Sequence, residues 1–103
     1  MRNYILLYTN DGVPEPHAGC ARCFIIRIRP SHKDDRGLLE HEKVHVDQWW
    51  KFWERKPKLE REVEAYREQL KWSPGREALF AMFIATRYGL DITATEAERR
   101  LRA

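Results

Sequence analysis

Apolar residues in the first third of the chain recur with a period of two. Residues 4–8 form a short aromatic and β-branched run that stops at the turn residues 9–12, which predicts a strand followed by a loop. In residues 24–29 apolar side chains alternate with arginines, so a second strand is predicted that ends before Pro30. We expect the two strands to pair antiparallel, with one face packed on helices.

From residue 34 onward the period changes to about three and a half, which is typical of helices. The apolar arc of the first predicted helix is so wide that neighbours must cover it on more than one side. The chain is thus expected to be an α+β domain. Its predicted helices are Gly37 to Arg55 with a cap at Asp34 or Asp35, residues 59–70, residues 78–88 after a Ser73-Pro74 cap, and a short basic helix from Thr93 or Thr95 through Leu101.

Length and composition restrict the possible architecture and partners. A chain of 103 residues with 43% apolar and 12% aromatic residues is expected to form a single domain, residues 1–103, around one core. The net charge of +3 does not favour nucleic acid as a partner. No apolar run reaches the roughly 18–20 residues of a membrane span, and the first residues lack a signal-peptide pattern. We therefore expect no membrane partner and a cytoplasmic location.

The two cysteines, Cys20 and Cys23, lie too close in sequence to staple the fold by a disulfide. With His17 nearby they form half of a zinc-knuckle spacing, but the chain has no second pair to complete it. We expect a simple pair of loop thiols. A second metal site and a redox pair are the alternatives.

The sequence His41-Glu42-Lys43-Val44-His45 has the spacing H-E-x-x-H on the first predicted helix. Residues four apart lie one above the other on a helix, so both imidazoles can reach one Zn²⁺ at about 2 Å, with Glu42 beside them as a base. The alternative is a helix whose histidines are satisfied by ordinary hydrogen bonds. Because the motif lies on a helix that other elements must cover, we expect a metal site with one Zn²⁺ per chain.

Catalytic zinc has three protein ligands and one open position, so another side chain must complete the site. The next predicted helix offers Glu60, Glu62 and Glu64. On a helical wheel with about 100° per residue, the mean direction of the apolar side chains marks the face that packs on the core. Glu62 points about 70° away from this direction, Glu60 about 90° and Glu64 about 130°. Glu62 is the best placed of the three, and Glu64 remains an alternative.

These motifs, followed by Gln48-Trp49 and by Glu62-Val63-Glu64-Ala65-Tyr66, resemble the gluzincin zinc metallopeptidases. In length the chain is similar to their smallest members, the minigluzincins and short zincin-like proteins of phages and bacteria. The resemblance implies a zincin-like fold, in which a small antiparallel sheet packs on the HExxH helix with two or three further helices. It also implies that Glu62 is the third ligand.

The chain departs from the family at Tyr66, where many gluzincins have an Asp that hydrogen-bonds a zinc-bound histidine. Tyr66 is therefore expected either to orient a ligand or polarise a substrate carbonyl, or to belong to the core. No histidine resembling the transition-state stabiliser of larger gluzincins can be identified in the sequence.

The resemblance further implies that strand 24–29 is the edge strand above the active helix, where an extended peptide could add by main-chain hydrogen bonds. Arg27 and Arg29 would then favour acidic groups, although charges on an edge strand also prevent aggregation. The expected function is zinc-dependent hydrolysis of a peptide or protein, with Glu42 as general base. The alternatives are a non-catalytic zinc domain, an enzyme kept latent by a terminal segment across its cleft, and a small basic nucleic-acid binder.

Overall fold

The computed structural model describes residues 3–103 and contains a mixed sheet, not the antiparallel pair that we expected. Strand β1 (Ile5–Tyr8) pairs parallel with β3 (Ile25–Ile28), and β2 (Gly19–Arg22) pairs antiparallel with β3. The alternating patterns located β1 and β3 but carried no information on their direction. Strand β2, predicted as loop, reverses the chain between them, so β1 and β3 run the same way.

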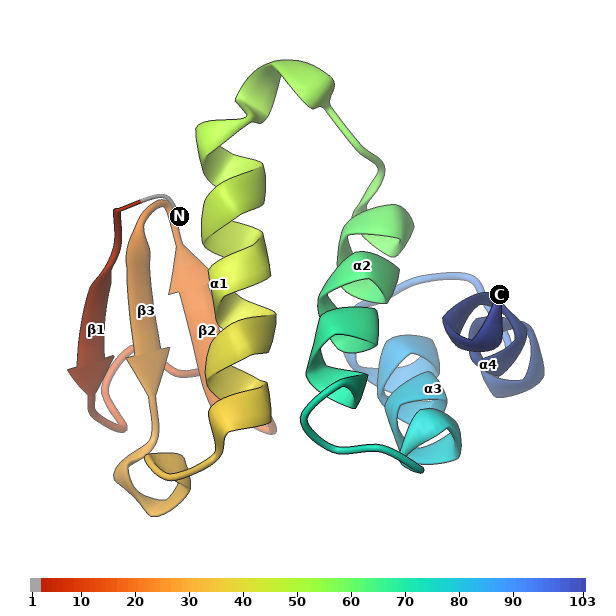
Figure 1. Ribbon diagram of the computed structural model, residues 1–103, viewed down its shortest axis with the longest axis horizontal. Helices are drawn as coiled ribbons and strands as arrows, with labels where there is room; N and C mark the ends of the chain where they lie inside the picture. The colour runs from red at the N-terminus through yellow and green to blue at the C-terminus, as the bar shows by residue number, and fades with distance from the viewer. Residues whose placement is uncertain (1–2) are drawn as a thin grey trace.

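The strand order β1-β3-β2 places β3 in the centre of the sheet. The expectation that strand 24–29 lies at the edge is therefore wrong, because β2 covers that side. The residues of β2 are Gly, Cys, Ala and Arg, which give no clear apolar alternation. Strand β2 is also the strand drawn next to the first long helix in Figure 1, and it is the edge strand that faces the candidate site.

Helix α1 (Arg36–Trp50) begins at Asp35, whose side chain accepts a hydrogen bond from the backbone N–H of Leu38 at 3.0 Å. A one-turn helix, η1 (Pro30–His32), precedes it. The helix ends five residues before the predicted end at Arg55, because Lys51 leaves helical geometry (φ −98°, ψ 39°). The short helix η2 (Phe52–Glu54) follows, and its aromatic side chains are exposed instead of continuing the buried stripe.

The three remaining helices agree closely with the sequence prediction. Thr93 caps the last of them by accepting from the backbone N–H of Glu96 at 3.1 Å. Ser73 does not cap a helix, since the third helix starts only after the turn residues that follow Pro74. The helices are α2 (Lys58–Leu70), α3 (Glu77–Arg87) and α4 (Ala94–Arg102).

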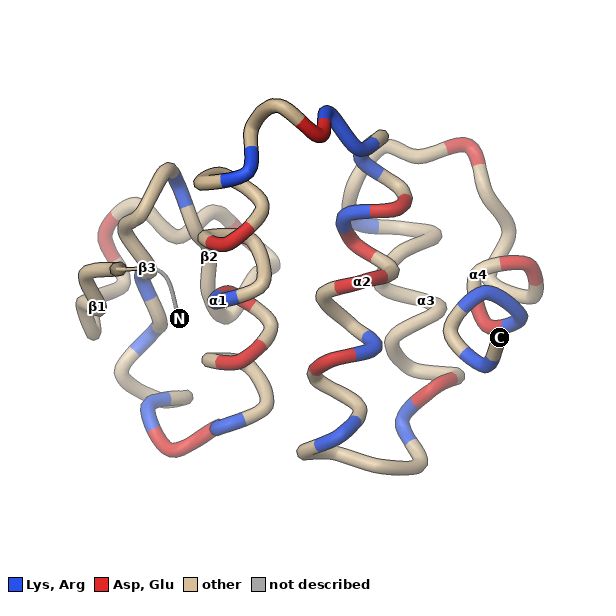
Figure 2. The backbone as a smooth tube through the Cα atoms, turned by 45° about the horizontal axis from the view of Figure 1, so that its top comes forward, with Lys and Arg blue, Asp and Glu red and all other residues tan. Residues whose placement is uncertain are grey.

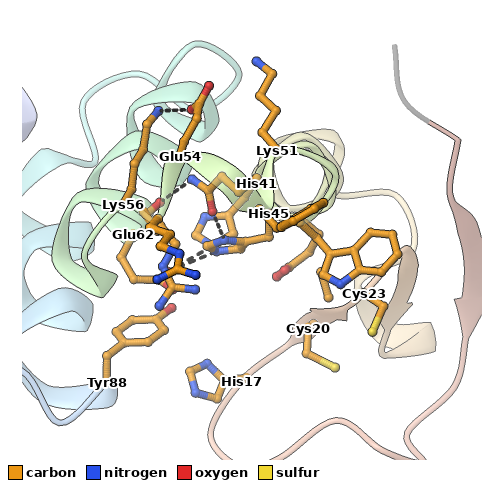
Figure 3. A pocket seen from close by; sticks show the side chains of 18 of the residues that line it. His17, Cys20, Cys23, His41, His45, Lys51, Glu54, Lys56, Glu62 and Tyr88 are labelled. Atoms are coloured by element: carbon orange, nitrogen blue, oxygen red, sulfur yellow. Dashed lines mark hydrogen bonds and ion pairs between the residues drawn. The ribbon is translucent and has the colours of Figure 1, made fainter.

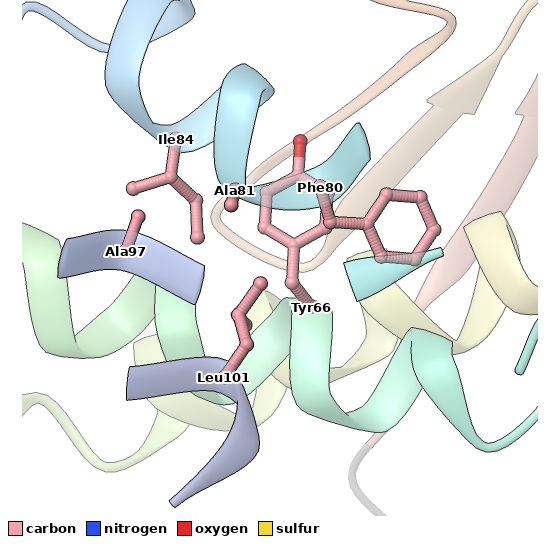
Figure 4. Packing of buried hydrophobic residues seen from close by; sticks show 6 residues of the cluster. All are labelled: Tyr66, Phe80, Ala81, Ile84, Ala97 and Leu101. Carbon is pink, nitrogen blue, oxygen red and sulfur yellow. The ribbon is translucent and has the colours of Figure 1, made fainter. Parts of the chain in front are cut away.

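Two hydrophobic clusters lie on either side of the α1–α2 pair (Figure 1). One packs the sheet against α1, through Ile26, Ile28, Leu38 and Val46. The other lies between α2, α3 and α4, and Figure 4 shows its buried members. They are Tyr66, Phe80, Ala81, Ile84, Ala97 and Leu101.

Helices α1 and α2, which carry the candidate ligands, pack against each other between these two clusters. On its other side, α1 packs on the sheet and α2 packs on α3 and α4. Within residues 3–103, no helix has the length and apolar character needed to cross a membrane.

Candidate metal centre

The H-E-x-x-H residues come together on α1 as the helical spacing predicts. His41 and Glu42 are buried, and His45 lies one turn further on, with 5.0 Å between the two imidazole centroids. Ligand atoms of His41, Glu42 and His45 all lie within 4.8 Å of one another. This group could hold a metal ion, and it is the one such group of three among residues 3–103.

Glu62 of α2 reaches both histidines across the helix interface. Its Oε1 lies 3.2 Å from His45 Nε2 and 3.7 Å from His41 Nε2, and its side chain is only 10% exposed. Figure 3 shows the three side chains converging at one end of a cavity. The structure thus places Glu62 where the helical-wheel argument expected it.

The other two candidate glutamates of α2, Glu60 and Glu64, do not join this cluster. Glu64 accepts hydrogen bonds from Lys56 Nζ at 2.7 Å and from Gln48 Nε2 at 3.0 Å. Partial burial raises the pKa of Glu64, but the hydrogen bonds from Lys56 and Gln48 outweigh it and hold the pKa below its ordinary value. Glu60 is exposed to solvent.

Glu42 is a carboxyl group in an unusual environment. Burial raises its pKa to about 7, although the charge of His45 acts in the opposite direction. Gly19 of β2 covers it so closely that a Cβ added there would lie 3.5 Å from Glu42 Oε2. A carboxylate with a pKa near neutrality can both accept and return a proton at pH 7.

Gln48 orients His45, accepting through Oε1 from His45 Nδ1 at 2.8 Å. Burial lowers the pKa of His45, but the hydrogen bond and charge of Glu62 outweigh it and raise the pKa to about 9. Because a histidine ligand must be neutral, a cation bound at Nε2 would displace this proton.

His41 lies deeper than His45. Burial, together with the nearby charge of His45, holds its pKa well below the ordinary value, whereas the side chain of Gln69 acts to raise it. Within residues 3–103, His41 Nδ1 and Gln69 Oε1 are both buried without a hydrogen-bond partner at normal distance. A small adjustment that joined these two atoms would fix the His41 ring with Nε2 facing Glu62.

Tyr66 lies beside His41, but its hydroxyl points to Tyr88 and not to the histidines. Its ring packs edge-on against His41 at 4.3 Å between centroids, and its hydroxyl hydrogen-bonds the hydroxyl of Tyr88 at 2.7 Å. Burial raises the pKa of Tyr66 above its ordinary value. The Tyr66 ring therefore belongs to the core, as one of the two expectations had it, and it packs against a candidate ligand.

Tyr88 and His17 also line the cavity. Sequence reasoning assigned no role to Tyr88, and it considered His17 only together with Cys20 and Cys23, as an alternative second metal site. Their ring centroids lie 5.3 Å apart, and both residues are labelled among those that line the cavity in Figure 3. Tyr88 appeared only as the last residue of a helix, and His17 only as a neighbour of the cysteines. No local pattern in the sequence places these two segments beside α1.

The cavity in front of the cluster has a volume of about 530 Å³. Strand β2 forms one wall, and α1 with the segment that joins it to α2 forms another. All of the residues that line it lie between 14 and 88, so neither described chain end covers it.

Cys20 and Cys23 are free thiols that also line this cavity. Burial raises the pKa of Cys20, and the charge of Glu42 adds to the shift. A raised pKa keeps the Cys20 thiol protonated and so makes it a poor nucleophile.

Arg29 does not line this cavity. It donates to the carbonyl groups of His17 at 2.8 Å and Val13 at 2.7 Å, and so holds the loop before β2 in place. Arg27 lies on the central strand β3, where its side chain covers Gly12.

Comparison with protein-family models, curated proteins and solved structures found no match for this chain.

Proposed function

We propose that this chain is a zinc-dependent peptidase of zincin-like fold, in which His41, His45 and Glu62 bind one Zn²⁺ and Glu42 is the general base. The observation that carries the proposal is the position of Glu62 Oε1, which lies 3.2 and 3.7 Å from the two imidazole Nε2 atoms. In a tetrahedral zinc site with bonds of about 2.1 Å, neighbouring ligand atoms lie roughly 3.4 Å apart. Both separations therefore fit one shared ion.

The donor set also favours zinc over the harder cations. Two imidazoles and one carboxylate suit Zn²⁺, whereas Mg²⁺ and Ca²⁺ prefer oxygen ligands alone. Three protein ligands leave one coordination position open, which is the arrangement of catalytic zinc and not of structural zinc. A cavity of about 530 Å³ in front of the cluster leaves room for a substrate.

When bound, zinc would polarise the carbonyl group of the scissile peptide bond and lower the pKa of water towards about 7. Glu42 would accept a proton from the attacking water and deliver it to the leaving nitrogen as the C–N bond breaks. Its pKa of about 7 suits both steps at neutral pH.

Tyr88, which lines the cavity, would donate a hydrogen bond to the carbonyl oxygen of a substrate. A tyrosine hydroxyl keeps its proton at neutral pH, and burial raises the pKa of Tyr88 further. Tyr66 holds that hydroxyl at 2.7 Å and so acts as a positioning residue for Tyr88. The free edge of β2 would bind the main chain of the substrate, in place of the strand expected from the resemblance.

Metal analysis of purified variants tests the ligand set. We expect one zinc ion per wild-type chain and its loss in His41→Ala or His45→Ala, because two ligands do not close a stable site. Glu62→Gln is expected to weaken zinc affinity at least about tenfold, whereas Glu64→Gln changes it little, since Glu64 contacts Lys56 and Gln48 instead. If Glu64→Gln were the damaging change, or if both histidine variants retained zinc, the proposed site would be wrong.

A further inference from the structure

Basic residues line the end of the cavity formed by the segment that joins α1 to α2 and by the start of α2. Figure 2 shows several basic positions along this segment of the backbone. Two of them, Lys51 and Lys56, form ion pairs with neighbouring carboxylates at 3.1 and 2.7 Å. Arg55 and Arg61 are exposed and have no carboxylate partner among residues 3–103. This end of the cavity therefore presents two guanidinium groups that are free to bind an anion.

Exposed aromatic side chains lie beside these arginines. Trp49 is 41% exposed and Phe52 is 74% exposed, and both line the cavity. Trp53, which is 61% exposed, contacts Phe52 without lining the cavity. An exposed aromatic patch beside a cavity is typical of a surface that receives an apolar group of a ligand.

On the opposite side of the histidines, the cavity wall is formed by strand β2. This wall presents main-chain groups instead of aromatic and basic side chains. Strand β2 is paired on one side only, by β3, and its residues Gly19, Cys20 and Ala21 line the cavity. Figure 3 shows Cys20 on the opposite side of the histidines from Lys56. A ligand between the walls would meet a free strand edge on one side, and aromatic and cationic groups on the other.

We infer that the substrate of the proposed peptidase is an extended acidic peptide, an inference that rests on the proposed function. Its main chain pairs with β2, a large apolar side chain packs on Trp49 and Phe52, and a carboxylate near the cleaved bond pairs with Arg61. Arginine suits this role because its planar guanidinium matches a carboxylate in two parallel hydrogen bonds. A nucleic acid would use the same aromatic and cationic groups, but it would leave the strand edge unused.

Two fluorescein-labelled octapeptides test this inference. Each has a central phenylalanine, flanked by glutamates in one peptide and by lysines in the other. We expect kcat/KM of the zinc-loaded wild type to be at least about tenfold higher for the glutamate peptide, because the lysines would face Arg55 and Arg61. The Kd of the Glu42→Gln protein, measured by fluorescence anisotropy, is expected to show the same preference without turnover.

Matched variants locate the two contacts. Arg61→Gln is expected to weaken binding of the glutamate peptide about threefold to fivefold and to leave binding of the lysine peptide no weaker. Arg67→Gln removes another exposed arginine of α2 outside the cavity and should change neither Kd. Phe52→Ala should weaken binding of both peptides more than Trp53→Ala does. Zinc content, measured in every variant, should be unchanged.

The outcomes separate the inference from the proposed function. Equal cleavage of both peptides, or equal effects of Arg61→Gln and Arg67→Gln, would overturn the acidic substrate and leave peptide hydrolysis standing. Arg61-dependent binding of the glutamate peptide with no cleavage by the zinc-loaded wild type would support the acidic-peptide surface and contradict the hydrolysis. Displacement of the peptide by a single-stranded DNA oligonucleotide, lost in Arg61→Gln, would assign the surface to nucleic acid and overturn the inference.

Discussion

Gln48 determines which nitrogen of His45 faces Glu62. Its amide nitrogen donates to the carbonyl oxygen of Arg61 at 3.1 Å and to Glu64 Oε1 at 3.0 Å. The amide oxygen is therefore left to accept from His45 Nδ1 at 2.8 Å. This arrangement fixes the tautomer and directs Nε2 of His45 at Glu62.

Replacing Gln48 by leucine is expected to lower zinc affinity about tenfold to a hundredfold, because His45 loses the acceptor that fixes its ring. Competition with a chromogenic chelator measures the change. Glu64→Gln is the control, since it alters a neighbour of Gln48 but leaves the bond to His45 in place. Equal affinities of Gln48→Leu and the wild type would show that Gln48 does not support the site.

At the scale of single residues, the sequence could predict only the parts of the site that local spacing determines. His41 and His45 share a helix face because they lie four positions apart, and Glu42 lies three positions before His45. Glu62 follows from the apolar direction of its own helix. Tyr88 reaches the site only through the packing of distant elements, and nothing in its local sequence records that contact.

At the scale of elements, helices were predicted more accurately than strands. The period of α2 and the caps of α1 and α4 are local signals, so their positions were close to correct. The direction of β1 relative to β3, and the existence of β2, depend on partners that are distant in sequence. The end of α1 was misplaced because its aromatic run continues into η2, where the side chains are exposed instead of buried.

Strand β2 begins with a glycine that packs closely on the neighbouring strand β3 and also contacts Glu42 of α1. A Cβ at Gly19 would lie 3.2 Å from the Arg27 carbonyl oxygen and 3.3 Å from Ile28 Cγ1, as well as 3.5 Å from Glu42 Oε2. Both of the shorter distances are tight for carbon contacts, and the carbonyl belongs to the central strand, which cannot move freely. Strand β2 would therefore have to shift relative to β3 to admit a side chain.

Gly19→Ala is expected to destabilise the domain by about 1–2 kcal/mol, which is the usual cost of one excess methyl group in a packed region. In a domain of this size that corresponds to a decrease in Tm of roughly 4–12 °C, measurable by circular dichroism. Gly19→Val should cost more. An unchanged Tm in both variants would mean that β2 does not pack on β3 at Gly19 as closely as described.

At the scale of the whole molecule, the candidate ligands connect two hydrophobic clusters. His41 and His45 lie on α1, which packs on the sheet, and Glu62 lies on α2, which packs on α3 and α4. A cation shared by these side chains would join the two halves of the fold. It would also compensate the negative charge of Glu62, a charge that protonated His45 compensates in the absence of a cation.

Zinc is therefore expected to stabilise the whole domain. A free zinc concentration of about a thousand times the Kd would raise the free energy of unfolding by about 4 kcal/mol, because the ion binds the folded chain and not the unfolded one. Thermal unfolding with and without a chelator should show an increase in Tm of at least about 10 °C for the wild type. Glu62→Gln should lose at least about a third of this increase, because a tenfold weaker affinity leaves about 2.7 kcal/mol at the same zinc concentration. A Tm independent of zinc in the wild type would contradict the shared site.

The most direct test of the central claim is peptide cleavage by Glu42→Gln, measured with the zinc-loaded wild type and variant on one peptide library. Glutamine retains the size of Glu42 but cannot accept a proton, so cleavage should decrease at least about a hundredfold while zinc content and Tm are retained. Undiminished cleavage by Glu42→Gln would contradict the account, because Glu42 would then not be the base. A zinc-loaded wild type that cleaves no peptide would contradict it as well, and would favour a non-catalytic zinc domain.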